Sequence, residues 1–203
     1  MATSSSDPRW FRTDTEIEAV SSLEFVLAQL VGVTQDDQAW RWVIIGLDRC
    51  LQSFLIASFG TAPAFLALRK EDSDHLYRAI RGEVPYRDKY YLQNLESLYK
   101  TAKRVHGWPV NDQIDRNIAR LQELRNNFLH RHPGSWSVEV SLLVAVTASA
   151  LSVIEYVGWR SNCFPWYHFR DGSSIVAAET LRLARETLRG FEKALNQRTQ
   201  EEP

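Results

Sequence analysis

Apolar residues recur at helical spacing along almost the whole chain, and no stretch alternates with a period of two for long. Spacings of three and four residues place side chains on one face of an α-helix, whereas a half-buried strand needs strict alternation. The pattern predicts helices at about residues 14–31, 36–59, 89–106, 111–131, 137–159 and 173–196. The expected fold class is all-α, a single helical bundle of about five long helices plus short ones, and one domain over residues 1–203 with an ordered core at about 12–196.

Two of these segments are unusually apolar. The helix at 36–59 is apolar nearly all round, which is typical of a central helix, and the only carboxylate in its central part is Asp48, with Gln52 one turn later. Val140–Ile154 is the longest uncharged run, and its fifteen residues include four hydroxyl side chains. It is therefore predicted to be a buried core helix, too short and too polar for a membrane span. Residues 61–88 are less regular, with a short helix expected from Ser73.

Composition and motifs argue against several classes of protein and of functional site. The 24 basic and 25 acidic residues nearly cancel, so any nucleic-acid or membrane site must be local. Cys50 and Cys163 make no disulfide framework, and the N-terminus shows no signal-peptide pattern, so a cytoplasmic location is expected. The sequence contains no glycine-rich phosphate loop, nucleophile elbow or zinc-protease motif. Cys163 and His168 are a lone pair of potential ligands, and neither a cofactor nor a metal is expected.

The predicted helix at 111–131 carries one charge inside its apolar stripe. At 100° per residue, Arg125 falls about 30° from the centre of that stripe. Burying a guanidinium costs several kcal/mol unless it is paired. Three interpretations are open: a structural ion pair with an acid of a neighbouring helix, for which Asp48 is the candidate; a position in a groove or subunit interface; or a site for an anion.

His130 lies near the end of the same helix, about 140° round from Arg125. The two side chains therefore cannot point at one small target from a straight helix, whereas Asn126 shares the side of His130. This arrangement fits best if two copies of the helix meet, so that the pairs from both chains surround one cleft. An imidazole ionises near neutral pH, which suits it to proton transfer.

The segment Leu124-Arg-Asn-Asn-Phe-Leu-His130 resembles the signature of the HEPN superfamily, in which arginine is followed after four to six residues by histidine. The similarity extends to Trp40-Arg-Trp42 with Leu51-Gln52, and to Pro133 followed by Trp136-Ser-Val-Glu139. Together these segments are similar to a group of small stand-alone bacterial HEPN proteins. The resemblance covers about residues 40–160, although 61–88 and the aromatic loop 159–169 have no counterpart in it.

The resemblance implies a metal-independent endoribonuclease that works as a homodimer on RNA, in a toxin or phage-defence role, often restrained by an antitoxin partner. It implies that Arg125 stabilises the phosphorane, that His130 transfers a proton at the ribose 2′-OH or the leaving 5′-oxygen, and that Asn126 orients the histidine or the phosphate. Possible supporting residues are Asp48, Gln52, His132 and Glu139. Other members of the superfamily have lost catalysis, so the alternative is a non-catalytic module that binds a nucleotide or a partner protein.

Three weaker features each have two interpretations. Residues 100–131 hold seven basic and three acidic residues, which form either a local phosphate-facing patch or a solvated helix surface. The aromatic loop 159–169 either stacks on bases or, as aromatic loops do more often, closes one end of the bundle. Glu139 either forms an orienting pair with His130 or favours the dipole of the helix that follows.

Overall fold

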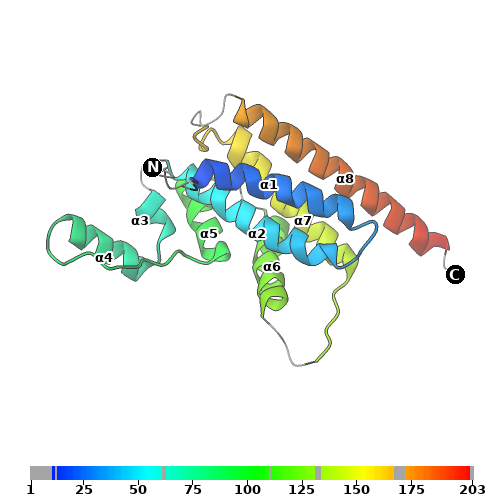
Figure 1. The fold of residues 1–203 in the computed structure, drawn as a ribbon, viewed down its shortest axis with the longest axis horizontal. Coiled ribbons are helices and arrows are strands. Elements are labelled where there is room, and N and C mark those ends of the chain that lie inside the picture. Colours follow the sequence, from blue (N-terminus) through cyan, green and yellow to red (C-terminus); the bar gives the residue numbers. More distant parts are fainter. Residues whose placement is uncertain are drawn as a thin grey trace, which may run out of the picture.

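The computed structural model describes residues 11, 13–60, 63–109, 111–130, 134–166 and 172–201, and this part of the chain is all-helical (Figure 1). The long helices are α1 (Thr15–Gly32), α2 (Ala39–Ser58), α5 (Leu95–His106), α6 (Asp112–Leu129), α7 (Val140–Glu155) and α8 (Ser173–Glu201). Shorter elements are α3 (Pro63–Ala67), α4 (Lys70–Ile80) and the π turn η1 (Tyr156–Arg160). The predicted all-α class is confirmed. The helix α3 was not predicted.

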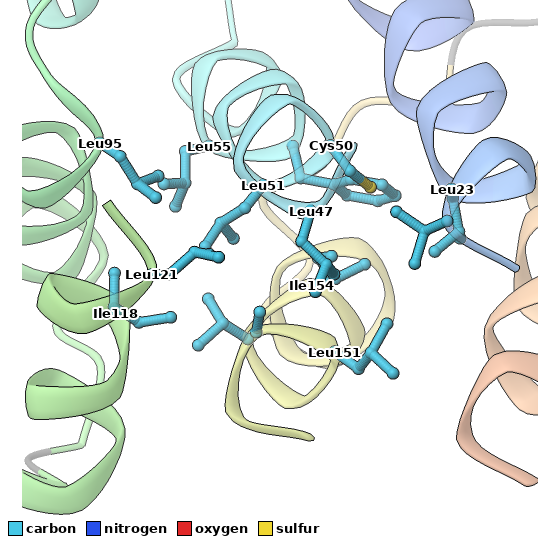
Figure 2. Close-up of a cluster of buried hydrophobic side chains, with 14 of the residues drawn as sticks. Leu23, Leu47, Cys50, Leu51, Leu55, Leu95, Ile118, Leu121, Leu151 and Ile154 are labelled. Atoms are coloured by element: carbon cyan, nitrogen blue, oxygen red, sulfur yellow. The ribbon is translucent and has the colours of Figure 1, made fainter. Parts of the chain in front are cut away.

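The core surrounds α2, as its nearly continuous apolar surface predicts. This helix contacts α1, α5, α6 and α7 as well as α3 and η1, while α8 packs against α1 and α7. Figure 2 shows side chains from five helices meeting around it: Leu23, Leu47, Cys50, Leu51, Leu55, Leu95, Ile118, Leu121, Leu151 and Ile154. Because α2 has neighbours on so many sides, its single central carboxylate, Asp48, is buried.

Asparagine caps fix where two of the helices begin. The Asn111 Oδ1 atom accepts from the backbone N–H of Ile114 at 3.0 Å at the start of α6, and Asn94 Oδ1 accepts from Ser97 N–H at 2.8 Å at the start of α5. The helix α5 ends at Gly107, whose φ of +64° is the left-handed cap conformation. The predicted cap at Asn111 is therefore correct, whereas the predicted start of α5 near residue 89 is six residues early.

Residues 63–94 form an arm that lies to one side of the bundle, with α4 packed against α3 alone among the elements of the described chain (Figure 1). An isolated β-bridge joins Leu68 to Leu92. The buried carboxylate of Asp72 accepts from Arg87 Nη1 at 2.8 Å and from the backbone N–H of Tyr91 at 3.1 Å. The short helix expected from Ser73 is present, and it begins three residues earlier.

The apolar helix α7 continues into η1 without a break, which makes a segment of 21 residues over Val140–Arg160 with a mean hydropathy of 1.9 over its most apolar 18 residues. By length and composition this segment could cross a membrane, so the expectation that it is too short and too polar for a span is wrong, because Glu155 and the π turn lengthen the helix beyond the uncharged run. In the fold, however, Val146, Ala150 and Leu151 are fully buried against neighbouring helices. Burial confirms the predicted role of α7 as a core helix.

Candidate functional site

Arg125 of α6 faces α2, where Asp48 lies. Its Nε is 3.6 Å from Asp48 Oδ2, and the Arg125 side chain is 36% exposed while that of Asp48 is 5% exposed. Its Nη1 donates to Asn126 Oδ1 at 3.0 Å. The ion pair considered from the sequence is therefore present. The Arg125 side chain is partly exposed, and among the described residues only its Nε and Nη1 have a partner.

Gln52 completes this group, because its Nε2 donates to the same Asp48 Oδ2 at 2.7 Å. Burial raises the pKa of Asp48 to about 6, although Arg125 and Gln52 both favour the charged form. Asp48 is thus mostly ionised at neutral pH and titrates just below it. We refer to Asp48, Gln52, Arg125 and Asn126 as the Asp48–Arg125 cluster. It joins α2 to α6 and contains four of the seven predicted site residues.

His130 ends α6 rather than lying within its last turn. Its backbone is extended (φ −97°, ψ 127°), and its N–H donates to the Asn126 carbonyl at 2.9 Å. The side chain is exposed and makes no hydrogen bond or ion pair with any described residue. The imidazole is therefore not part of the Asp48–Arg125 cluster. Asn126 connects the two, since its side chain bonds Arg125 and its carbonyl bonds the His130 backbone.

Of the two remaining predicted residues, Glu139 is not part of this cluster. His132 lies outside the described residues. Glu139 is the exposed N-cap residue of α7, and its carboxylate accepts from Ser141 Oγ at 3.3 Å rather than contacting His130. Its position favours the helix-dipole interpretation. Within the described residues, no three His, Cys, Asp or Glu side chains gather where a metal ion could bind.

An open groove of about 680 Å³ runs along the outer face of α6 beside Asn126, with Arg116 and Arg120 on its wall. Asn117 also lines the groove and was missed from the sequence. This side chain is buried, and its Nδ2 donates to Ser149 Oγ of α7 at 2.7 Å. The sequence did indicate its burial, because residue 117 falls about 50° from the centre of the apolar stripe of the helix.

The positive charge of residues 100–131 is partly neutralised in the described part of the fold. Four of its cations form ion pairs, namely Lys100–Glu96, Lys103–Asp115, Arg120–Glu123 and Arg125–Asp48. Two of these acids, Glu96 and Asp48, lie outside residues 100–131 and were not counted in the sequence. Among the described residues, Arg104 and Arg116 have no acidic partner. The arrangement favours the interpretation of this stretch as a solvated helix surface.

The aromatic loop closes one end of the bundle in the part of it that the structure describes. The ring of Phe54 in α2 contacts Trp159, Phe164 and Trp166, with centroid distances of 6.0, 4.8 and 6.3 Å. Trp166 Nε1 donates to the carbonyl of Gly158 at 2.8 Å. These rings therefore pack on the core. Residues 167–169 lie outside the described part.

No protein-family model, curated protein or solved structure matches the chain. The similarity to HEPN proteins consequently stays a prediction made from the residues, and the function has to be inferred from the geometry of α6 and its neighbours.

Proposed function

We propose that the chain is a metal-independent endoribonuclease of HEPN type, a toxin or phage-defence effector that cleaves RNA in a cleft formed across a homodimer. The observation that carries the proposal is the chain of contacts at the end of α6. A partly exposed arginine side chain is held by a buried carboxylate and by Asn126, one turn before an exposed, helix-ending histidine. An antitoxin partner would restrain such an enzyme in the cell.

Arg125 is suited to bind a phosphoryl group. A guanidinium carries five N–H donors, and its contacts with Asp48 and Asn126 engage only Nε and Nη1. The remaining donors are available to the phosphoryl oxygens. Because Asp48 and Asn126 hold the group in place before substrate binds, little reorganisation accompanies charge development in the transition state.

His130 supplies the proton transfer in this proposal. The 2′-oxygen attacks phosphorus as its proton passes to a base, the bond to the 5′-oxygen breaks, and that oxygen takes up a proton. The products are a 2′,3′-cyclic phosphate and a 5′-hydroxyl. Since His130 and Arg125 leave α6 on different sides, the histidine of one copy would act together with the arginine of the other.

The test is RNA cleavage in the presence of EDTA, on tRNA and on total RNA. We expect the wild-type chain to cleave and the Arg125→Ala and His130→Ala variants to lose at least about 100-fold in rate. Arg182→Ala is the matched control, because Arg182 is an exposed arginine of α8 whose ion-pair partners among the described residues are Glu179 and Glu186. Product ends are identified by their response to phosphatase and kinase treatment.

Each other outcome points to a named alternative. A folded dimer that cleaves none of these RNAs would contradict the ribonuclease and favour a non-catalytic module for a nucleotide or partner protein. Loss of cleavage together with loss of folding in Arg125→Ala would instead indicate that the Asp48–Arg125 pair is structural. Thermal melting of each variant separates these cases.

A further inference from the structure

A second pocket lies where η1 meets α5, α7, α8 and the start of α6. It is a pocket of about 330 Å³ with walls formed by Tyr99, Trp108 and Tyr156 and a charged rim that includes Arg160 and Arg185. This volume is in the range of small-molecule sites. None of its residues belongs to the Asp48–Arg125 cluster or to the groove beside Asn126.

The walls present aromatic surface from three segments. The Trp108 ring lies 6.1 Å from Tyr99 and 5.5 Å from Tyr156, and it is nearly perpendicular to Tyr156 at 78°. Trp108 is 8% exposed, and its Nε1 has no hydrogen-bond partner among the described residues. A buried donor without a partner is costly. The Nε1 atom is itself buried, so Trp108 contributes ring surface to the pocket rather than a hydrogen-bond donor.

The π turn creates the charged rim. The Ser161 N–H donates to the Tyr156 carbonyl at 2.8 Å, five residues back, and this wider turn brings Arg160 Nη2 within 2.6 Å of Glu155 Oε1. In a regular α-helix, residues five apart point about 140° away from each other. Arg185 of α8 bonds the other oxygen of Glu155. Such π turns occur frequently at functional sites.

One carboxylate thus orients two guanidinium groups and leaves the rim with one positive charge in excess. Arg160 uses a single N–H for Glu155, while Arg185 uses one for Glu155 and one for Ser152 Oγ. Several of the five donors of each group remain open. An excess of one charge matches a monoanion, and planar guanidinium donors suit a carboxylate.

We propose that this pocket binds a small aromatic carboxylic acid. Its ring would lie against Trp108 and Tyr156, and its carboxylate would bind Arg160 and Arg185 beside Glu155. The proposal does not depend on the ribonuclease function, since the two sites share no residue.

The test is isothermal titration calorimetry of the full chain with benzoate, phenylacetate and indole-3-acetate, each paired with its neutral amide. We expect saturable binding of at least one acid and at least tenfold weaker binding of its amide. Arg160→Gln should weaken the acid at least tenfold and leave the amide unchanged. Arg182→Gln is the control, because Arg182 lies on α8 without lining this pocket.

The Arg160 side chain is 67% exposed, so its substitution should not unfold the chain, and thermal melting verifies this. Tyr156→Leu, which removes one aromatic wall, should weaken the acid and its amide alike. The proposal is overturned if no acid binds, if each amide binds as well as its acid, or if Arg160→Gln and Arg182→Gln have the same effect.

Discussion

At the residue scale, the Asp48–Arg125 cluster depends on the ionisation of a buried carboxylate. Burial raises the pKa of Asp48 to about 6 against the opposing effect of Arg125, with Gln52 and Arg49 contributing less. In an unfolded chain an aspartate ionises near 3.9. Between about pH 4 and 6 the folded state therefore binds more protons at this site than the unfolded chain does. In that window the free energy of unfolding falls as pH rises.

Asp48→Asn should remove this pH dependence. A pKa raised from 3.8 to about 6 corresponds to about 3 kcal/mol of unfolding free energy lost by the wild type between pH 4 and 7. The variant should show a flatter profile in urea unfolding from pH 4 to 8 and should match or exceed the wild type at pH 8. Asp74→Asn, at an exposed carboxylate of α4, is the control. Parallel profiles for Asp48→Asn and the wild type would contradict the prediction.

Arg125 should stabilise the fold only while Asp48 is charged. Arg125→Gln removes the ion-pair partner of the buried carboxylate, and because Arg125 is 36% exposed we expect a cost of about 1 kcal/mol at pH 8. A double-mutant cycle of Arg125→Gln with Asp48→Asn should give a coupling energy of about 1 kcal/mol at pH 8 that shrinks toward pH 5. A coupling energy that does not change with pH would show that the pairing is not electrostatic.

At the element scale, the arm at 63–94 is held by a small number of contacts. The only buried residues of α4 are Asp72 and Ala79. The two carboxylate oxygens of Asp72 hold the returning loop through Arg87 and Tyr91, and the bridge between Leu68 and Leu92 completes the attachment. Few buried apolar contacts imply a unit that opens independently of the bundle.

Asp72→Ala should therefore loosen the arm without unfolding the bundle. Two hydrogen bonds are lost, and we expect local opening to become easier by about 1–3 kcal/mol. In hydrogen exchange, the amides of Arg69 and Tyr91 should exchange faster while those of α2 stay protected. Asp74→Ala is the matched control on the same helix. Equal loss of protection in α2 would show that the arm and the bundle unfold as one unit.

The positions of the helices show which parts of the fold could be predicted from the sequence and which could not. Apolar spacing and the cap at Asn111 are local signals, and they located the ends of the long helices to within five residues except for the start of α5. The start of α5 was misplaced because residues 91–93 are held extended by a bridge to residues 67–69, a contact between distant parts of the chain. The helix α3 has five residues, too few for a period to show.

In the candidate site, too, local signals could be predicted from the sequence and contacts between distant parts of the chain could not. Asp48 and Arg125 were both recognisable as charges on apolar faces, and they do pair. Asn117 escaped notice because a neutral amide stands out less among leucines than a charge does. The pocket at the π turn was not predictable, since it requires a turn closed by an i→i+5 hydrogen bond and side chains from five elements. The helical spacing of apolar residues predicts neither a π turn nor the contacts between distant elements that form a pocket.

At the scale of the whole molecule, one copy of the chain does not complete the proposed ribonuclease site. Arg125 faces α2, whereas His130 is exposed at the end of α6 and is absent from the Asp48–Arg125 cluster. Next to His130, Leu129 is 45% exposed, and Trp136 is 42% exposed while its ring contacts Phe128. Exposed apolar side chains beside an incomplete site are where a second copy would pack.

We therefore expect the chain to have twice its monomer mass of 23.4 kDa in light scattering at micromolar concentration. Leu129→Glu should convert it to a folded monomer, because it places a charge in the apolar contact, and should abolish cleavage although Arg125 and His130 are intact. Leu183→Glu is the matched control, since Leu183 is a comparably exposed leucine of α8. A monomeric wild-type chain that cleaves RNA would overturn the shared cleft, because Arg125 and His130 would then have to act within one copy. A dimer that survives Leu129→Glu would move the interface away from the end of α6, and with it the reason for pairing the histidine of one copy with the arginine of the other.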